Sequence, residues 1–89
     1  MSTVFLALQA NEETRPIIEA ITADNPHAVV REAPAMVKID AEGRLTVRRQ
    51  SIEDRIGREF DLRELQVNLI SLSGHLDETD DEFTLSWNA

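Results

Sequence analysis

The stretch PAMVKIDAEGRLTVRR, residues 34–49, decides the fold that the sequence predicts. Apolar side chains alternate with more polar ones on both sides of a short break, at Val37, Ile39, Leu45 and Val47. This alternation is typical of strands that bury one face, and it predicts a hairpin around a loop of Ala41, Glu42 and Gly43. Gly43 can adopt the positive φ that a short loop needs, and Pro34 cannot donate to a ladder, so pairing should begin after Pro34.

Two apolar runs outside this hairpin predict two central strands. The first is VFLALQ, residues 4–9, which we expect to be covered on both faces, and the second is VNLISL, residues 67–72. A shorter β-like run at residues 28–32 predicts another strand before the hairpin. A last strand with one buried face is predicted by the alternation of Phe83, Leu85 and Trp87 with polar neighbours.

A first helix is expected after the first central strand. Asn11 offers a cap, so the helix should begin at Glu12 or Glu13, where negative charge is favoured by the helix dipole. It should end at Asp24, because the residue before Pro26 resists the helical region. The expected buried stripe consists of Ile17, Ile18, Ala20 and Ile21.

A second, short helix is expected after the hairpin. Ser51, with Asp54 three positions later, resembles a capping box, and Gly57 fits the position just past the helix end. Asp61 can then cap one further helical turn.

Both halves of the chain therefore read as a strand, a capped helix and further strands, a β-α-β-β pattern that occurs twice. The pattern predicts an α+β fold, in which a mostly antiparallel sheet packs with two main helices. Because 89 residues suffice for one modest core, residues 1–89 are expected to form a single domain.

Composition excludes several classes of function. The formal net charge of −8 argues against a nucleic-acid partner, because phosphate binding relies on lysines and arginines. The chain contains no cysteine, and its first residues lack a positive segment followed by a long apolar run. We therefore expect a cytoplasmic protein without a membrane partner.

Charge is also distributed unevenly along the chain. Basic residues concentrate between positions 31 and 58, whereas residues 77–82 form an acidic loop. This asymmetry suits docking on a complementary protein surface, and it equally suits solvated faces that keep a small acidic protein in solution.

No motif for chemistry stands out. His27 and His75 have no partner at the spacing that builds a metal site within a helix. Ser71 and Ser73 lie close to His75 but lack a third, orienting group, which disfavours a hydrolase. The three glycines are isolated, so no phosphate-binding loop is formed. These patterns predict no cofactor and favour a binding module over an enzyme.

The chain as a whole resembles a known family. NEETRPIIEAI, DNPHAVVREAPAMVKIDAEGRLTVRR, IGREFDL and NLISLSGHLDETDDEFTLSW are similar to segments of the stimulatory, or regulatory, components of multicomponent phenol hydroxylases. These components belong to the effector family of soluble diiron monooxygenases, together with regulatory protein B of methane monooxygenase. The resemblance extends from Val4 to Trp87.

The resemblance implies a non-catalytic effector without a cofactor, which docks on the diiron hydroxylase and stimulates hydroxylation by changing its conformation. It also implies a functional link to the flavin and iron–sulfur reductase of the system. The loop between the last two strands lies at the docking surface of better-known relatives. That loop and two secondary regions give the expected partner-binding residues: Ser71, Ser73, Gly74, His75, Leu76, Asp77, Asn11, Arg15, Arg44 and Arg48.

Two other functions remain open at this point. The protein could bind an aromatic compound on its own in a space between sheet and helices, although the chain has little length to spare for a cavity. Hydrolase or calcium chemistry would require turnover or bound metal without a partner protein. The sequence leaves open whether the free protein self-associates.

Overall fold

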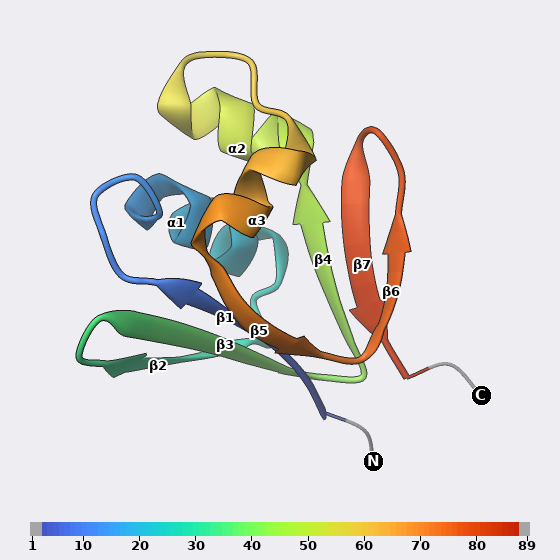
Figure 1. Cartoon of the computed structure of the whole chain (residues 1–89). Coiled ribbons are helices and arrows are strands. Elements are labelled where there is room, and N and C mark those ends of the chain that lie inside the picture. Colours follow the sequence, from blue (N-terminus) through green and yellow to red (C-terminus); the bar gives the residue numbers. More distant parts are fainter. Residues whose placement is uncertain (1–2, 88–89) are drawn as a thin grey trace.

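The computed structural model describes residues 3–87, which form two antiparallel sheets and a group of helices (Figure 1). Sheet A has the strand order β2-β3-β1-β5, and sheet B has the order β4-β7-β6. In chain order the elements are β1 (Thr3–Gln9), α1 (Arg15–Asp24), β2 (Val29–Ala33), β3 (Met36–Glu42), β4 (Arg44–Arg48), α2 (Arg49–Ile56), the 3-10 helix η1 (Leu62–Glu64), α3 (Leu65–Asn68), β5 (Leu69–Ser73), β6 (His75–Glu78) and β7 (Glu82–Ser86). The predicted α+β class is confirmed.

One hydrophobic cluster joins both sheets to the helices. The strands contribute Val4, Leu6, Leu8, Val37, Ile39, Ala41, Leu45, Val47, Phe83 and Leu85. The helical segments contribute Ile17, Ala20, Ile21, Ile52, Leu62 and Leu65. The expected buried stripe of α1 is confirmed except at Ile18, which is only partly buried. We call the sheet faces that point to this cluster inner, and the opposite faces outer.

β1 is the central strand that the sequence predicted, because it lies between β3 and β5. Its inner face is fully buried. Its outer face is less completely covered, since Phe5 is half-buried beneath the ammonium group of Lys38, which lies 4.4 Å from the ring centroid.

The prediction of a hairpin around Gly43 is wrong. β3 and β4 follow one another but belong to different sheets, and β4 pairs with β7 instead. Residues of odd number face the core on both sides of Gly43, so the chain bends there without reversing. Gly43 adopts a φ of +84°, which lets one long apolar alternation serve two sheets.

The true hairpin lies one strand earlier, between β2 and β3. Its two-residue turn is Pro34-Ala35, and Ala33 pairs with Met36 across it. Proline followed by a residue with positive φ is the pattern of a type II turn, and Ala35 has a φ of +65°. The interruption at Pro34 therefore marks a hairpin tip.

Both long helices begin at residues other than those predicted. α1 begins at Arg15, because Asn11 accepts a hydrogen bond from the backbone N–H of Thr14 and closes a separate turn first (2.9 Å). α2 begins at Arg49, so Ser51 lies within the helix and caps nothing. The predicted end of α1 at Asp24 is confirmed.

Two local signals after α2 are confirmed. Gly57 ends the helix in the left-handed conformation, with a φ of +74°. Asp61 caps η1 through a capping box in which its carboxylate accepts from the N–H of Arg63 and the Glu64 carboxylate accepts from the N–H of Asp61 (2.9 Å each).

The second apolar run does not form a central strand. Its first residues continue the helical turn of α3, and β5 lies at the edge of sheet A. β6 replaces the first part of the expected acidic loop, and it pairs with β7 as the edge of sheet B. The second half of the chain thus has one strand more than predicted. Its strand β5 belongs to sheet A, together with the strands of the first half.

A buried asparagine joins α1 to sheet B. The side chain of Asn25 is 3% exposed, and its Nδ2 donates to the carbonyl oxygens of Ile21 (2.7 Å) and Thr46 (2.6 Å). Its Oδ1 accepts from the backbone N–H of Thr46 (3.0 Å). The amide therefore takes the place of a neighbouring strand beside β4.

Gly74 makes the second passage between the sheets, from β5 to β6. Its φ is +133°, and a Cβ at this position would lie 2.8 Å from Cγ1 of Val4 in the core. The first and last strands also meet near this corner, where the indole N–H of Trp87 donates to the carbonyl oxygen of Thr3 (3.0 Å).

Candidate docking surface

The residues that the sequence predicted for docking lie on several separate surfaces. Ser71 and Ser73 belong to β5, where they pair with Ala7 and Phe5 on the outer face of sheet A. Ser71 is exposed and Ser73 is half-buried. Gly74 then carries the chain into sheet B. The expected docking loop is thus two strands joined by a corner.

Four of the predicted residues share the outer face of sheet B: Arg44, Arg48, His75 and Asp77. Arg44 and His75 both pair with Ser86, and Arg48 pairs with Glu82. His75 Nε2 lies 3.7 Å from Asp77 Oδ1, and Arg48 Nε lies 4.0 Å from Glu82 Oε2. Exposed pairs of this kind contribute little to stability, so these side chains are available to a partner.

Leu76 points to the other side of β6. It pairs with Leu85, which in turn pairs with Leu45, and both partners are fully buried. Leu76 itself is 38% exposed because β6 is the edge of its sheet. It therefore extends the hydrophobic core outward to the surface.

Asn11 is exposed, and its side chain also makes hydrogen bonds within the molecule. Its Oδ1 accepts from Thr14, and its Nδ2 donates to Oδ1 of the buried Asn68 (3.0 Å). The side chain thereby ties the start of α1 to the end of α3. These bonds give Asn11 a structural role, and its role in docking stays a prediction.

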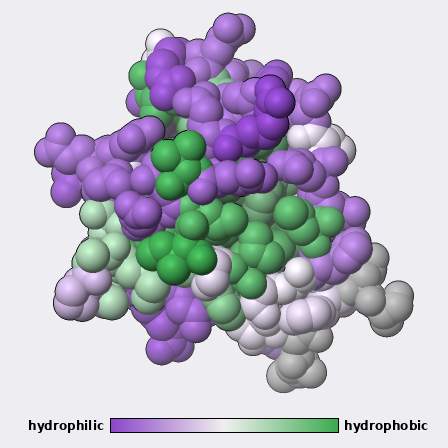
Figure 2. Space-filling model, in the orientation of Figure 1, coloured by the Kyte–Doolittle hydropathy of each residue, from purple (hydrophilic) through white to green (hydrophobic). Residues whose placement is uncertain are grey.

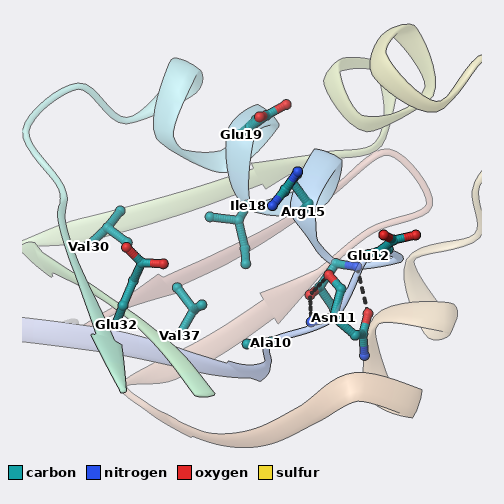
Figure 3. Close-up of a pocket in the computed structure, with 10 residues that line it drawn as sticks. Ala10, Asn11, Glu12, Arg15, Ile18, Glu19, Val30, Glu32 and Val37 are labelled. Carbon is teal, nitrogen blue, oxygen red and sulfur yellow. Dashed lines mark hydrogen bonds between the residues drawn. The ribbon is translucent and has the colours of Figure 1, made fainter. Parts of the chain in front are cut away.

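Arg15 lies beside Asn11 at a groove of about 470 Å³ between α1 and β2 (Figure 3). Ile18, Val30 and Val37 form its apolar floor. The rim carries three carboxylates, those of Glu12, Glu19 and Glu32. The groove is open to solvent, so it does not enclose a small aromatic molecule as the alternative function would require.

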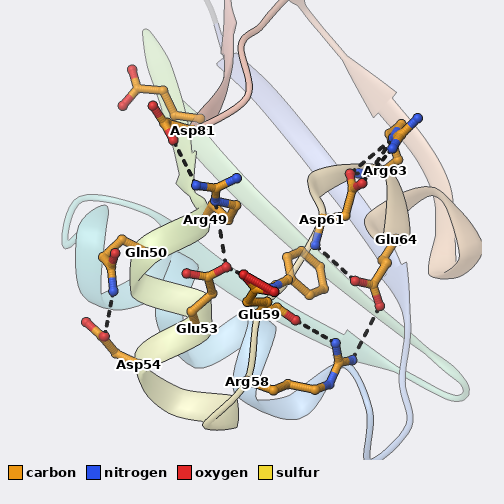
Figure 4. Close-up of polar contacts among 12 residues, drawn as sticks. Arg49, Gln50, Glu53, Asp54, Arg58, Glu59, Asp61, Arg63, Glu64 and Asp81 are labelled. Atoms are coloured by element: carbon orange, nitrogen blue, oxygen red, sulfur yellow. Dashed lines mark hydrogen bonds and ion pairs between the residues drawn. The ribbon is translucent and has the colours of Figure 1, made fainter.

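A network of charged side chains ties α2 to the segments that follow it (Figure 4). Arg49 lies 3.1 Å from Asp81 and 3.7 Å from Glu53, whose carboxylate also accepts from the N–H of Phe60 (2.8 Å). The hydrogen bond from the Arg63 guanidinium to Asp61 (2.7 Å), together with the bond from the Arg63 backbone, lowers the pKa of Asp61 to about 2. These contacts connect α2 and the segment after it to η1.

Replacing Asp61 with Asn should remove a pH-dependent part of the stability. The pKa of folded Asp61 (about 2) lies below the usual 3.8, so the ionised carboxylate stabilises the fold fully at pH values above 3.8. This contribution to stability is lost as the pH falls towards 2. We expect the difference in Tm between wild type and Asp61→Asn to shrink as pH is lowered from about 4 to about 2. Thermal unfolding across this range measures it.

Arg63→Leu is the matched control, since it keeps the carboxylate and removes the guanidinium. In the Arg63→Leu background, the pH-dependent difference in Tm that Asp61→Asn produces should be mostly lost. A difference between wild type and Asp61→Asn that stays constant with pH would contradict this account of the capping box.

Among residues 3–87, no group of three or more His, Cys, Asp or Glu side chains is arranged to hold a metal ion. No helix in this part of the chain is long and apolar enough to cross a membrane. What the described surface offers a partner is hydrogen bonds, exposed charges and apolar side chains.

The sequence and the fold place this chain in a family. Residues 2–86 match the model of the MmoB/DmpM family, and the protein belongs to that family. Phenol 2-monooxygenase stimulatory component DmpM from Pseudomonas sp. (strain CF600) is 48% identical over 86 residues, covering 97% of this chain and 96% of the relative. The effector subunit of the alkene monooxygenase system of Xanthobacter autotrophicus (strain ATCC BAA-1158 / Py2) is 32% identical over 79 residues, covering 84% and 76%.

Solved structures agree with this placement. A chain in a solved phenol hydroxylase–regulatory protein complex matches with a TM-score of 0.94 at 42% identity, covering 98% of this chain and 100% of that chain. Regulatory protein B of soluble methane monooxygenase matches with a TM-score of 0.77 at 26% identity, covering 97% of this chain and 65% of that chain. The family resemblance inferred from the sequence is confirmed, and these relatives are stimulatory, effector or regulatory components.

Two exposed residues beside the predicted set could not be recognised from the sequence. Val67 and Ile70 were expected in a central strand, whereas they are 73% and 48% exposed. The apolar run that contains them predicted burial, and for these two residues that prediction is wrong.

Proposed function

We propose that this protein is the stimulatory component of a multicomponent phenol hydroxylase. It binds the hydroxylase component and increases hydroxylation by changing the conformation of that enzyme, without catalysing a reaction itself. The observation that carries the proposal is the match along nearly the full length of both chains to a phenol 2-monooxygenase stimulatory component. The family resemblance supports a diiron hydroxylase as the partner, which would receive electrons through a flavin and iron–sulfur reductase.

Stimulation of this kind has a thermodynamic requirement. A ligand shifts an equilibrium between two conformers only if it binds one of them more tightly than the other. A tenfold shift requires about 1.4 kcal/mol of differential binding. Such a difference is well within the range of one small protein interface, so no covalent or redox chemistry is needed on this chain.

The docking residues belong to the same proposal. Ser71, Ser73, Gly74, His75, Leu76 and Asp77 contact the hydroxylase from the corner between β5 and β6. Both strands are sheet edges, and the corner joins them. Arg44 and Arg48 extend this contact across the outer face of sheet B, because they share that face with His75 and Asp77. Arg15 is a more distant candidate, on the rim of the groove beside α1.

Residues 1–89 act in this proposal as one effector domain, because both sheets contribute to one hydrophobic cluster. The protein acts in the cytoplasm, where the reduced nicotinamide that drives a hydroxylase is produced.

Titrating the purified hydroxylase and reductase with this protein should raise the rate of phenol oxidation to a plateau. It should also raise the amount of product formed per NADH consumed, because the effector couples electron use to hydroxylation. Steady-state assays of both quantities test the proposal. An unchanged rate and an unchanged yield across the titration would refute it. Saturable heat on mixing phenol with this protein alone would instead favour a small-molecule binding protein.

A further inference from the structure

The two edges of sheet A are protected very differently. β2 carries Arg31, which pairs with Asp40 (2.8 Å), next to Glu32, and Pro34 follows the strand. Charges and proline on an edge strand prevent unwanted pairing with other chains. β5, at the opposite edge, has the sequence LISLS and carries neither.

The absence of charge extends well beyond β5. Residues 65–76 are twelve consecutive positions without Asp, Glu, Lys or Arg, the longest such run in a chain that is 29% charged. The other long uncharged run, at residues 1–11, contains the central strand β1, where burial explains it. Burial explains only part of the run at residues 65–76, because Leu65 and Asn68 are buried whereas Val67, Ile70 and Leu76 are exposed.

The hydrophobic core reaches the surface along this run. β5 and β6 are the edges of different sheets and are joined by Gly74, so the core between the sheets is closed here only by side chains. Figure 2 shows a hydrophobic area in the middle of this side of the molecule, where α3, β5 and β6 lie. Its most exposed members are Val67 (73%), Ile70 (48%) and Leu76 (38%), which we call the apolar strip.

The strip accounts for half of the large hydrophobic residues that are exposed among the described residues. The others are Val29, Val30 and Trp87. Val29 and Val30 lie on the charged edge strand β2, and Trp87 is fixed by its bond to Thr3. Among residues 3–87, the strip runs from α3 along the edge strands β5 and β6 in a segment without charged residues, and such an apolar surface has the composition of an interface core.

We propose that the apolar strip is the central contact with the hydroxylase component, and that it meets an uncharged, apolar area on that enzyme. This inference rests on the proposed function and specifies the surface that performs it. The charged outer face of sheet B then forms the rim of the contact. Burial of apolar side chains at the centre supplies affinity, and the charges around them orient the two proteins.

Val67→Asp and Ile70→Asp test the strip, with Val29→Asp as the matched control. Val29 is 53% exposed on the opposite edge of the same sheet, so its substitution introduces the same charge at a similar exposure. Calorimetric titration of each variant into the purified hydroxylase component measures Kd. We expect each strip variant to raise Kd by at least about tenfold, and Val29→Asp to change it by less than about threefold.

All three variants should melt within a few degrees of the wild type, since exposed substitutions change stability little. If Ile70→Asp melts much lower, Val67→Asp decides, because its side chain is the more exposed. The inference is overturned if the wild type binds and the strip variants bind equally well, or if Val29→Asp weakens binding as much as they do. A wild-type protein that neither binds nor stimulates would refute the proposed function, and the strip with it.

Discussion

Asn25→Ala should lower the free energy of unfolding by about 2–4 kcal/mol, although the residue looks in the sequence like an ordinary helix end. The reason is what the alanine would leave behind. The N–H and C=O of Thr46 would lose their partners at a partly buried site, whereas the carbonyl oxygen of Ile21 would keep the backbone N–H of residue 25. A buried polar group without a partner destabilises the fold by more than the bond itself contributes.

Thermal and urea unfolding measure this effect, and a loss of this size should lower Tm by roughly 10 °C or more in a chain of this length. Thr22→Ala is the control in the same helix, because its hydroxyl bonds only to the carbonyl oxygen of Glu19 at an exposed position. That variant should change stability by less than about 0.5 kcal/mol. Equal effects of the two substitutions would contradict the bridging role of Asn25.

Asn25→Asp separates the two functions of the amide. The carboxylate can still accept from Thr46, but it would face two carbonyl oxygens that now accept hydrogen bonds from Nδ2. Repulsion from these oxygens would raise the pKa of the new carboxyl in the folded state. The variant should therefore gain stability relative to Asn25→Ala as pH falls through the raised pKa towards about 4, the pKa of an unfolded Asp, and should gain no more below it.

Gly74→Ala should be similarly severe, with a loss of about 2–4 kcal/mol. Two causes combine at this corner. Residues with a Cβ rarely adopt a φ of +133°. The Cβ of the alanine would also lie 2.8 Å from Cγ1 of the buried Val4. Val4 is in the central strand, so it cannot move aside without disturbing the core.

Gly43→Ala is the matched control, because Gly43 has a φ of +84° but a Cβ added there would meet no atom within 4 Å. Backbone strain alone should then cost about 1–2 kcal/mol. Urea unfolding of the two variants measures the difference. If Gly43→Ala were as destabilising as Gly74→Ala, the close approach to Val4 would not be what requires glycine at the corner.

Local chemistry is what the sequence predicted well. Gly57 and Asp61 were identified correctly because a left-handed helix end and a capping carboxylate depend only on residues a few positions away. The buried stripe of α1 followed from helical periodicity for the same reason. The α+β class followed from the order of these local elements.

Strand partners were predicted less well, because pairing is decided between residues far apart in the chain. The alternation around Gly43 is equally consistent with a reversal and with a bend, and only β7, much later in the chain, decides between them. The acidic residues before β7 suggested a loop, although His75 to Glu78 find a partner strand there.

The candidate site was located in part. The residues from Ser71 to Asp77 lie on exposed edges, as a docking region requires, but they are divided between the two sheets by Gly74. Asn11 is exposed as expected, but its bond to Asn68 could not be predicted because the two residues are distant in sequence. Val67 and Ile70 were assigned to the interior because an apolar run has the same pattern whether its residues are buried or exposed.

The bond between Trp87 and Thr3 provides a built-in optical probe. Trp87 is the only tryptophan in the chain, and it is half exposed at the point where the first and last strands meet. Its emission therefore reports on a single place in the molecule, and a shift in wavelength would record the separation of these two strands.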